Sequence, residues 1–434
     1  MMLNSTERLL LTLVAAVAVT PFLLASDASA AIGWRATGSL AVPRADHTAT
    51  ALRDGTVLVA GGRQQTTDPA PTASAELYYP ATGAWITVGT MASTRADHTA
   101  TLLDGPVCAR AMPPTWCGKV LVAGGTTGPT SAELYDPKTR SFSPTGSLIT
   151  PRRRHTATTL PDDGTVLVAG GETMTGTGTT SRLSSAELYD PAAGTWRPTG
   201  SLAEARAEHS AVLLPDGNAL AAGGTADDAD GRQVALASAE AYAPATGLWS
   251  SAGSLTIARY EATATLLPDG RPLFVGGLDT RFTPRRSTEI YAPSAPGGPW
   301  IDGGSMNVGR GRHTATALPD GTTLVTGGET AGIASTELYS AETATWSSAA
   351  PLATGRARHT ATLLGGPRCA SSCGDVLVVG GRRGITPLAS AELYSPPPPS
   401  TTLTGPPGRV TDLSAKTLSA RRIRLIFSAP GSVG

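Results

Sequence analysis

Charged and aromatic residues are scarce in this sequence, and no charge of one sign prevails. Asp, Glu, Lys and Arg make up 16% of the 434 residues and Phe, Trp and Tyr 5%, while 34 basic residues balance 34 acidic ones. A neutral chain has no overall electrostatic attraction to nucleic acid or to an anionic membrane surface. We therefore expect no nucleic-acid partner. Glycine (50) and proline (34) are abundant instead, which suits many short strands joined by turns.

Long apolar runs are also lacking, with one exception near the start. Arg8 precedes an apolar run from Leu9 to Ala25, and Ala28-Ser29-Ala30 follows. This order is typical of a secretory signal peptide, so residues 1–30 are predicted to be one and the protein to be secreted or held at the cell surface. A retained membrane anchor is the alternative. After cleavage no segment is apolar enough to span a bilayer.

Cysteine is rare, and its four copies fall into two local pairs. Cys108 and Cys117 form one pair, and Cys369 and Cys373 form the other. In an exported chain this spacing predicts two hairpin disulfides. A metal site at the second pair is the alternative, but neither a second pair nor a histidine lies near it. We expect no metal and no cofactor.

What the sequence has is a repeat. The stretch 152–196 reads RRRHTATTL-PDDG-TVLVAGG, then a polar loop, then SAELYD-PAAG-TW, and it recurs seven times. Each copy predicts four short strands, with a Pro-Asp-Gly turn between the first two. The second strand, Thr165 to Ala169, is apolar throughout and is therefore expected to be buried on both faces. A period of about 50 residues indicates a propeller or another closed array.

The fixed positions of the repeat resemble those of the kelch family. A Gly-Gly doublet, a Glu-x-Tyr and an aromatic residue recur in this order. The resemblance implies an all-β, seven-bladed propeller over residues 34–395. The doublets are Gly61-Gly62, Gly124-Gly125, Gly170-Gly171, Gly223-Gly224, Gly276-Gly277, Gly327-Gly328 and Gly380-Gly381. The Glu and Tyr positions are Glu76/Tyr78, Glu133/Tyr135, Glu187/Tyr189, Glu240/Tyr242, Glu289/Tyr291, Glu337/Tyr339 and Glu392/Tyr394, and the aromatic positions are Trp85, Phe142, Trp196, Trp249, Trp300 and Trp346.

The two ends of the repeat region are incomplete in complementary ways. The seventh copy has no tryptophan after Tyr394, whereas residues 34–40 match residues 196–202 almost letter for letter. We infer that the N-terminal segment supplies the outer strand of the last blade and closes the ring. Residues 396–408 are predicted to be a Pro-rich linker. Residues 409–434 resemble the opening strands of a fibronectin type III domain. A complete domain of this kind needs about 100 residues, so this segment is predicted to be an incomplete one.

One slot of the repeat holds all six histidines, each preceded three residues earlier by an arginine. A ring of such residues could bind a metal or an anion, but a residue copied once per blade is better explained by what each blade needs. We therefore predict a structural role, with each Arg or nearby backbone N–H groups satisfying the Glu of the repeat. Tyr and Trp are predicted to pack between blades, and Trp116 is either an exposed anchor or folded onto its own disulfide. The histidines are His47, His98, His155, His209, His313 and His359, with Ala262 in blade 5; the arginines are Arg44, Arg95, Arg152, Arg206, Arg259, Arg310 and Arg356.

The loops after the Gly-Gly doublets differ from blade to blade, so ligand specificity is predicted to lie there, on one face. Calcium binding by the acidic loop of blade 4 is the weaker interpretation, because it lacks the spacing and turn glycine of a calcium loop. The candidate ligand residues are Arg63, Asp227, Asp228, Asp230, Asp279, Arg281, Arg285, Arg286, Arg382 and Arg383.

These features favour a secreted binding or scaffold module, a monomer with an extracellular protein or polysaccharide partner. No catalytic residues stand apart from the repeats, so no enzyme activity is expected. Two alternatives remain. One is a propeller similar to galactose oxidase, a copper-radical enzyme, that has lost or lacks its catalytic residues. The other is a structural spacer in a larger surface protein.

Overall fold

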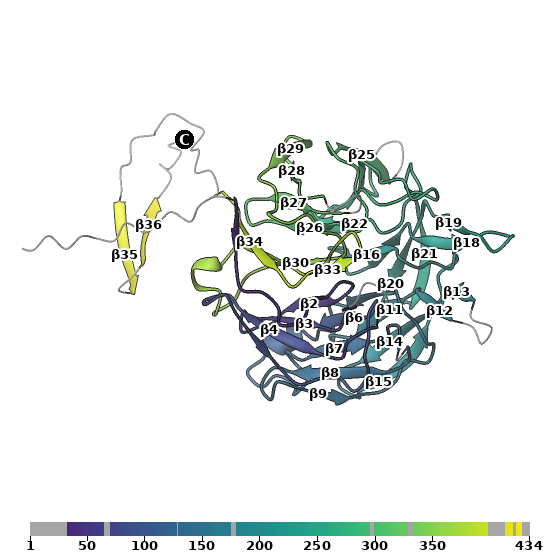
Figure 1. The fold of residues 1–434 in the computed structure, drawn as a ribbon, viewed down its shortest axis with the longest axis horizontal. Helices are drawn as coiled ribbons and strands as arrows, with labels where there is room; N and C mark the ends of the chain where they lie inside the picture. The colour runs from purple at the N-terminus through teal and green to yellow at the C-terminus, as the bar shows by residue number, and fades with distance from the viewer. Residues whose placement is uncertain are drawn as a thin grey trace, which may run out of the picture.

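The computed structural model describes residues 33–64, 70–127, 129–174, 179–295, 299–328 and 333–397, and two later strands, β35 (Leu413–Ser419) and β36 (Arg422–Phe427). Seven antiparallel four-stranded sheets surround a central axis (Figure 1). The expected seven-bladed propeller is therefore confirmed. Two short 3₁₀ helices, η1 (Pro106–Ala109) and η2 (Ala370–Ser372), lie in the disulfide loops.

The first six blades use their strands in sequence order, from the axis outward. The first three blades are β2 (Thr48–Ala51), β3 (Val57–Ala60), β4 (Ala75–Tyr79), β5 (Ala84–Thr87); β6 (Thr99–Leu102), β7 (Val120–Ala123), β8 (Ala132–Asp136), β9 (Ser141–Pro144); and β10 (Thr156–Thr159), β11 (Val166–Ala169), β14 (Ala186–Asp190), β15 (Thr195–Thr199). The next three are β16 (Ser210–Leu213), β17 (Ala219–Ala222), β20 (Ser238–Ala243), β21 (Leu248–Ser254); β22 (Thr263–Leu266), β23 (Pro272–Val275), β24 (Ser287–Tyr291), β25 (Trp300–Ser305); and β26 (Thr314–Ala317), β27 (Thr322–Thr326), β28 (Thr336–Ser340), β29 (Thr345–Ala349).

The seventh blade joins both ends of the chain. It consists of β30 (Thr360–Leu363), β31 (Val376–Val379), β34 (Ala391–Ser395) and β1 (Gly33–Ala36). Trp34 is paired with Tyr394 in register, as Trp196 is with Tyr189 in blade 3. The predicted closure of the ring by the N-terminal segment is thus confirmed.

The apolar second strands form the core, because each is buried on both faces between two neighbouring blades. All four residues of β3, β7, β11 and β31 are buried. Val57 and Val59 of blade 1 pack against Leu377 and Val379 of blade 7 in one cluster. The core is therefore a series of interfaces between blades, which only the closed ring completes.

A buried ion pair occurs in every blade. Arg152 donates hydrogen bonds to Glu187 at 2.7 Å and to the carbonyl oxygens of Gly170 and Ser185. The Glu187 carboxylate also accepts hydrogen bonds from the backbone N–H groups of Ile149 and Thr150. The prediction that the Arg satisfies the Glu is confirmed, but the N–H groups come from the segment leading into the blade and not from the doublet. The seven pairs are Arg44–Glu76, Arg95–Glu133, Arg152–Glu187, Arg206–Glu240, Arg259–Glu289, Arg310–Glu337 and Arg356–Glu392.

The histidines connect neighbouring blades. His155 Nε2 lies 3.0 Å from the hydroxyl of Thr99 in the preceding blade. A Cβ added at Gly124 of that blade would lie 2.8 Å from His155 Cε1, so the doublet leaves room for the ring and supplies the positive φ that the turn requires. Burial lowers the pKa of His47, His98, His209 and His313 to about 3, so these imidazoles are neutral. The predicted structural role agrees with this placement.

The aromatic residues also pack between blades, as predicted. Trp196 lies 5.0 Å from Tyr189 between ring centroids and donates to the Gly146 carbonyl of the preceding blade. Trp116 is buried beside Cys108, and a Cβ on Gly164 of blade 3 would lie 2.7 Å from its ring. The exposed-anchor alternative for Trp116 is therefore wrong. The ring folds onto its own disulfide loop, as the other alternative predicted, and also packs against the next blade.

The two expected disulfides are present, Cys108–Cys117 and Cys369–Cys373. Strands β35 and β36 pair antiparallel, and the fibronectin-like character of this region remains a prediction. The predicted signal peptide and the linker from residue 398 onward lie outside the described residues. Among the residues that are described, no helix is long and apolar enough to cross a membrane.

Candidate functional site

Seven backbone hydrogen bonds form a closed ring around the propeller axis. One residue per blade contributes, immediately before the histidine slot, and its N–H donates to the carbonyl of the same slot in the preceding blade at 2.9–3.4 Å. All seven have φ between 47° and 56°, a left-handed conformation that is unfavourable for residues other than glycine. We call them the axial ring: Asp46, Asp97, Arg154, Glu208, Glu261, Arg312 and Arg358.

Every residue of the axial ring is charged. Arg154 contacts Glu208 at 2.8 Å, and Arg358 contacts Asp46 at 2.6 Å and Glu261 at 3.2 Å. Arg312 is paired with Glu261. Four residues of the ring, Asp46, Glu261, Arg312 and Arg358, line a cavity of about 250 Å³ together with His47, Ala262, His313 and His359. This volume is slightly below the lower limit of about 300 Å³ for small-molecule sites.

The carboxyl groups of the ring have unequal proton affinities. Burial raises the pKa of Glu261 to about 7; the Glu208 carboxylate adds to this, while Arg358 and Arg312 oppose it. Burial also raises the pKa of Glu208. At Asp97 burial acts in the same direction, but Arg154 and Arg63 outweigh it and hold the pKa below its usual value. The axial ring therefore combines two carboxyl groups with raised pKa values, Glu261 and Glu208, with one carboxylate, Asp97, whose pKa is lowered.

The predicted ligand loops begin beside this ring. The backbone of Arg63 forms an antiparallel β-bridge with Ala45, and that of Arg382 forms one with Ala357. The Arg63 side chain is paired with Asp97 at 2.6 Å. Arg383 is exposed in β32 (Arg382–Arg383), which pairs with β33 (Thr386–Pro387). The loops of blades 3 and 4 are hairpins as well, built from β12 (Glu172–Met174) with β13 (Thr180–Arg182) and β18 (Thr225–Asp227) with β19 (Gln233–Ala235).

The acidic loop of blade 4 is satisfied within the chain. Asp227 is paired with Arg182 at 2.5 Å, and Asp230 with Arg232 at 2.8 Å. Asp228 accepts the backbone N–H groups of Asp230 and Arg232. These carboxylates therefore have partners within the hairpins of blades 3 and 4.

The loop of blade 5 is arranged similarly. Asp279 accepts the N–H groups of Arg281 and Thr283 and is paired with Arg285 at 2.8 Å. Arg286 donates to the Met306 carbonyl. The candidate residues thus form an outer rim, while the axial ring, which sequence reasoning did not identify, lies at the centre. The signal was present as a charged residue at the same slot of all seven copies.

Residues 152–203 match the model of the Kelch motif. No curated protein matches the sequence of this chain. Among solved structures, the chain is similar to a fungal alcohol oxidase of the AA5 family in complex with copper. Identity is 18%, the TM-score is 0.63, and the match covers 84% of this chain and 77% of that one. This similarity shows the propeller fold.

The described residues do not fit a copper ion. Imidazole and thiolate groups suit copper, but the six imidazoles are buried between blades and the four cysteines form disulfides. Within the described ranges, no three His, Cys, Asp or Glu side chains are grouped so as to hold a metal.

The prediction that the chain is not an enzyme requires correction. It depended on the lack of catalytic residues outside the repeats. The similar structure is an alcohol oxidase with a similar propeller fold, so the lack of catalytic residues outside the repeats does not place this chain outside the enzymes.

Proposed function

We propose that this chain is a propeller of the alcohol-oxidase type whose axial face recognises a small, hydroxyl-rich molecule such as a sugar or polyol. The single observation that carries the proposal is the closed ring of seven charged residues, four of which line the cavity. Left-handed backbone at seven non-glycine residues costs stability, and such strain typically accumulates at functional sites.

The chemistry of the ring favours a neutral ligand. Together with Arg63 it presents four carboxyl groups and four guanidinium groups. A hydroxyl group both donates and accepts a hydrogen bond, whereas carboxylates only accept and guanidinium groups only donate. Neighbouring hydroxyls on one molecule therefore match this mixture of acceptors and donors better than a ligand of one charge does.

Calorimetry with neutral sugars and polyols would test the proposal. We expect saturable binding that weakens at least about tenfold in Glu261→Gln and in Arg358→Gln, since each removes one partner of the ring. Asp230→Asn, on the outer rim, is the matched control and should bind normally. Binding unaffected by both ring substitutions would contradict the proposal.

Oxidation of a primary alcohol to an aldehyde, with dioxygen taking up the two electrons and two protons as hydrogen peroxide, is the second candidate, and the similarity to the AA5 oxidase favours it. The test is hydrogen peroxide release from the same ligand panel, with and without added copper. Copper-dependent peroxide would establish catalysis on this propeller. No peroxide, together with binding at the axial ring, would restrict the site to recognition.

We also propose that the protein acts outside the cytoplasm, as a monomer. The two disulfides support an oxidising compartment. N-terminal sequencing of the exported protein should begin at Ala31, and light scattering should give the mass of one chain. A chain retained in the cytoplasm would contradict this proposal.

A further inference from the structure

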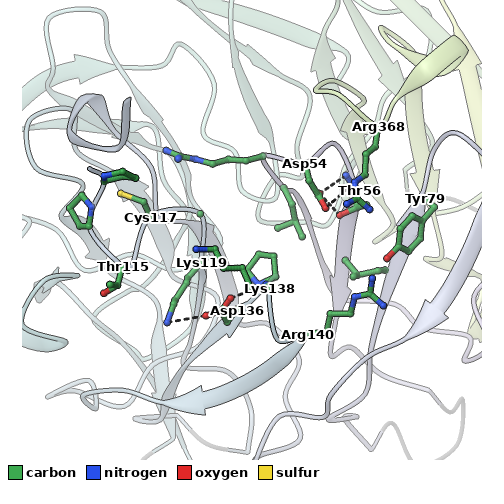
Figure 2. Close-up of a pocket in the computed structure, with 17 residues that line it drawn as sticks. Asp54, Thr56, Tyr79, Thr115, Cys117, Lys119, Asp136, Lys138, Arg140 and Arg368 are labelled. Carbon is green, nitrogen blue, oxygen red and sulfur yellow. Dashed lines mark hydrogen bonds and ion pairs between the residues drawn. The ribbon is translucent and has the colours of Figure 1, made fainter. Parts of the chain in front are cut away.

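A second cavity, of about 590 Å³, lies on the face opposite the axial ring, between blades 1 and 2 (Figure 2). Its walls are the first turn of blade 1, the disulfide loop of blade 2 and the outer turn of blade 2. Blade 7 adds Arg368. The lining includes Leu52, Arg53, Asp54, Tyr79, Pro113, Pro114, Cys117, Lys119, Asp136, Lys138 and Arg140.

The disulfide loops of blades 7 and 2 pack against the first turn of blade 1 from its two sides. A Cβ on Gly55 of blade 1 would lie 2.7 Å from the Gly365 carbonyl oxygen in the blade 7 loop. A Cβ on Gly118, in the blade 2 loop, would lie 3.4 Å from Arg53. Both insertions into the repeat thus contact the same turn, which gives the cavity a fixed wall on each side.

The lining is basic although the chain as a whole is neutral. Five cationic side chains line it against two carboxylates, a surplus of three. Both carboxylates are already paired, Asp136 with Lys119 at 3.2 Å and Asp54 with Arg368 at 3.5 Å. Arg53 is paired with Asp104. Among the described residues, Lys138 and Arg140 form no side-chain ion pair, and both are exposed.

Arg140 occupies a position where glycine is the better residue. Its φ is 55°, and the same turn position holds Gly83, Gly194 and Gly247 at 67–71° and Ala344 at 52° in other blades. An arginine there costs about 1 kcal/mol in backbone strain, and its exposed side chain gains no core packing. Strain of this kind at a cavity wall indicates a functional side chain.

Tyr79 is a second departure from the repeat. The equivalent positions of the other blades hold Asp136, Asp190, Ala243, Ala292, Ser340 and Ser395. With Pro113 and Pro114, the Tyr79 ring gives the cavity flat apolar surface. Ligand sites combine such surface with a few polar groups that fix orientation.

We propose that this cavity binds an acidic sugar unit, a uronate or a sulfated sugar, with its ring against Tyr79 and its anionic group held by Arg140 and Lys138. Guanidinium groups match the paired oxygens of carboxylate and sulfate. The site is separate from the axial face, so either proposal can fail without the other.

Calorimetry with glucuronate, a glucuronate oligomer, glucose and inorganic sulfate tests the assignment. We expect the two acidic saccharides, or the oligomer alone, to bind at least about tenfold more tightly than glucose and sulfate, and less tightly as salt rises. Lys138→Gln with Arg140→Gln should abolish binding. Arg271→Gln, on the same face and paired within its own turn, is the matched control.

Arg140→Gly separates function from folding. Glycine accepts the left-handed conformation, so this variant should melt at the same or a higher temperature than the parent while losing affinity for the saccharide. Undiminished affinity in Arg140→Gly would overturn the proposal, as would equal affinity for glucose or for sulfate. The proposal would also be overturned if no acidic saccharide bound saturably at concentrations up to about 10 mM, because the Kd would then be weaker than the millimolar range.

Discussion

Arg206 is shared by two carboxylates of very different burial. Its Nη2 lies 2.8 Å from Glu240, whose side chain is 6% exposed, and 3.8 Å from Glu204, whose side chain is 43% exposed. The same guanidinium thus provides an internal comparison between a buried and a surface ion pair. The buried one recurs in every blade, and only it is completed by backbone N–H groups.

Glu240→Gln should destabilise the protein by about 3–5 kcal/mol, because it leaves the Arg206 charge buried without its partner. Glu204→Gln should cost less than about 1 kcal/mol. Chemical denaturation of the two variants measures both. Equal losses would mean that the buried pairs do not stabilise the blades.

Trp34→Ala should weaken the closure of the ring. The Trp34 ring packs against Tyr394 at a tilt of 52°, with 5.1 Å between ring centroids, and its Nε1–H donates to the Ala350 carbonyl of blade 6. Trp196→Ala removes matched contacts inside a blade formed by continuous chain, so each variant should lose about 3–5 kcal/mol. Hydrogen exchange should rise throughout β1 and β34 only in Trp34→Ala. Protection of β1 equal to that of the parent would contradict this.

Ala262→His, combined with Ser210→Thr, should stabilise blade 5. Ser210 donates to the Ala262 carbonyl, whereas the other six copies hold a Thr–His contact there. Gly223 leaves the space that the imidazole needs. We expect a gain of about 1 kcal/mol from the restored hydrogen bond, measured as a rise in Tm. The opposite change, His209→Ala, should lower Tm, and a destabilised double variant would show that blade 5 has a different packing.

Glu261 should make stability depend on pH. Its folded pKa, about 7, lies above the value of 4.5 expected in the unfolded chain, so its contribution is fully present below pH 4.5 and is lost as pH rises to about 7. Thermal melts of Glu261→Gln and the parent should differ little near pH 5. Between pH 5 and pH 8, the free energy of unfolding of the variant should increase relative to that of the parent by on the order of 1–3 kcal/mol. A constant difference across this range would contradict the raised pKa.

The repeat itself could be predicted from the sequence, because local rules determine it. The apolar VLVA strands, the turns and the Gly-Gly doublets each specify one blade by burial, backbone freedom and hydrogen bonding within about 50 residues. The match between residues 34–40 and 196–202 also revealed the closure, since both copies carry the same packing pattern. The loops after the doublets were less predictable, because short hairpins such as β12–β13 have too few residues for a clear period.

Two features depended on tertiary structure alone. The axial ring brings one charged residue from each blade into contact around the axis, and which charges become neighbours follows from the order of the blades. The basic cavity combines Arg53 with Arg368, from opposite ends of the chain, because closure places blade 7 beside blade 1. The sequence specified each blade through local interactions, whereas both candidate sites arise between blades, where ring geometry decides which side chains meet.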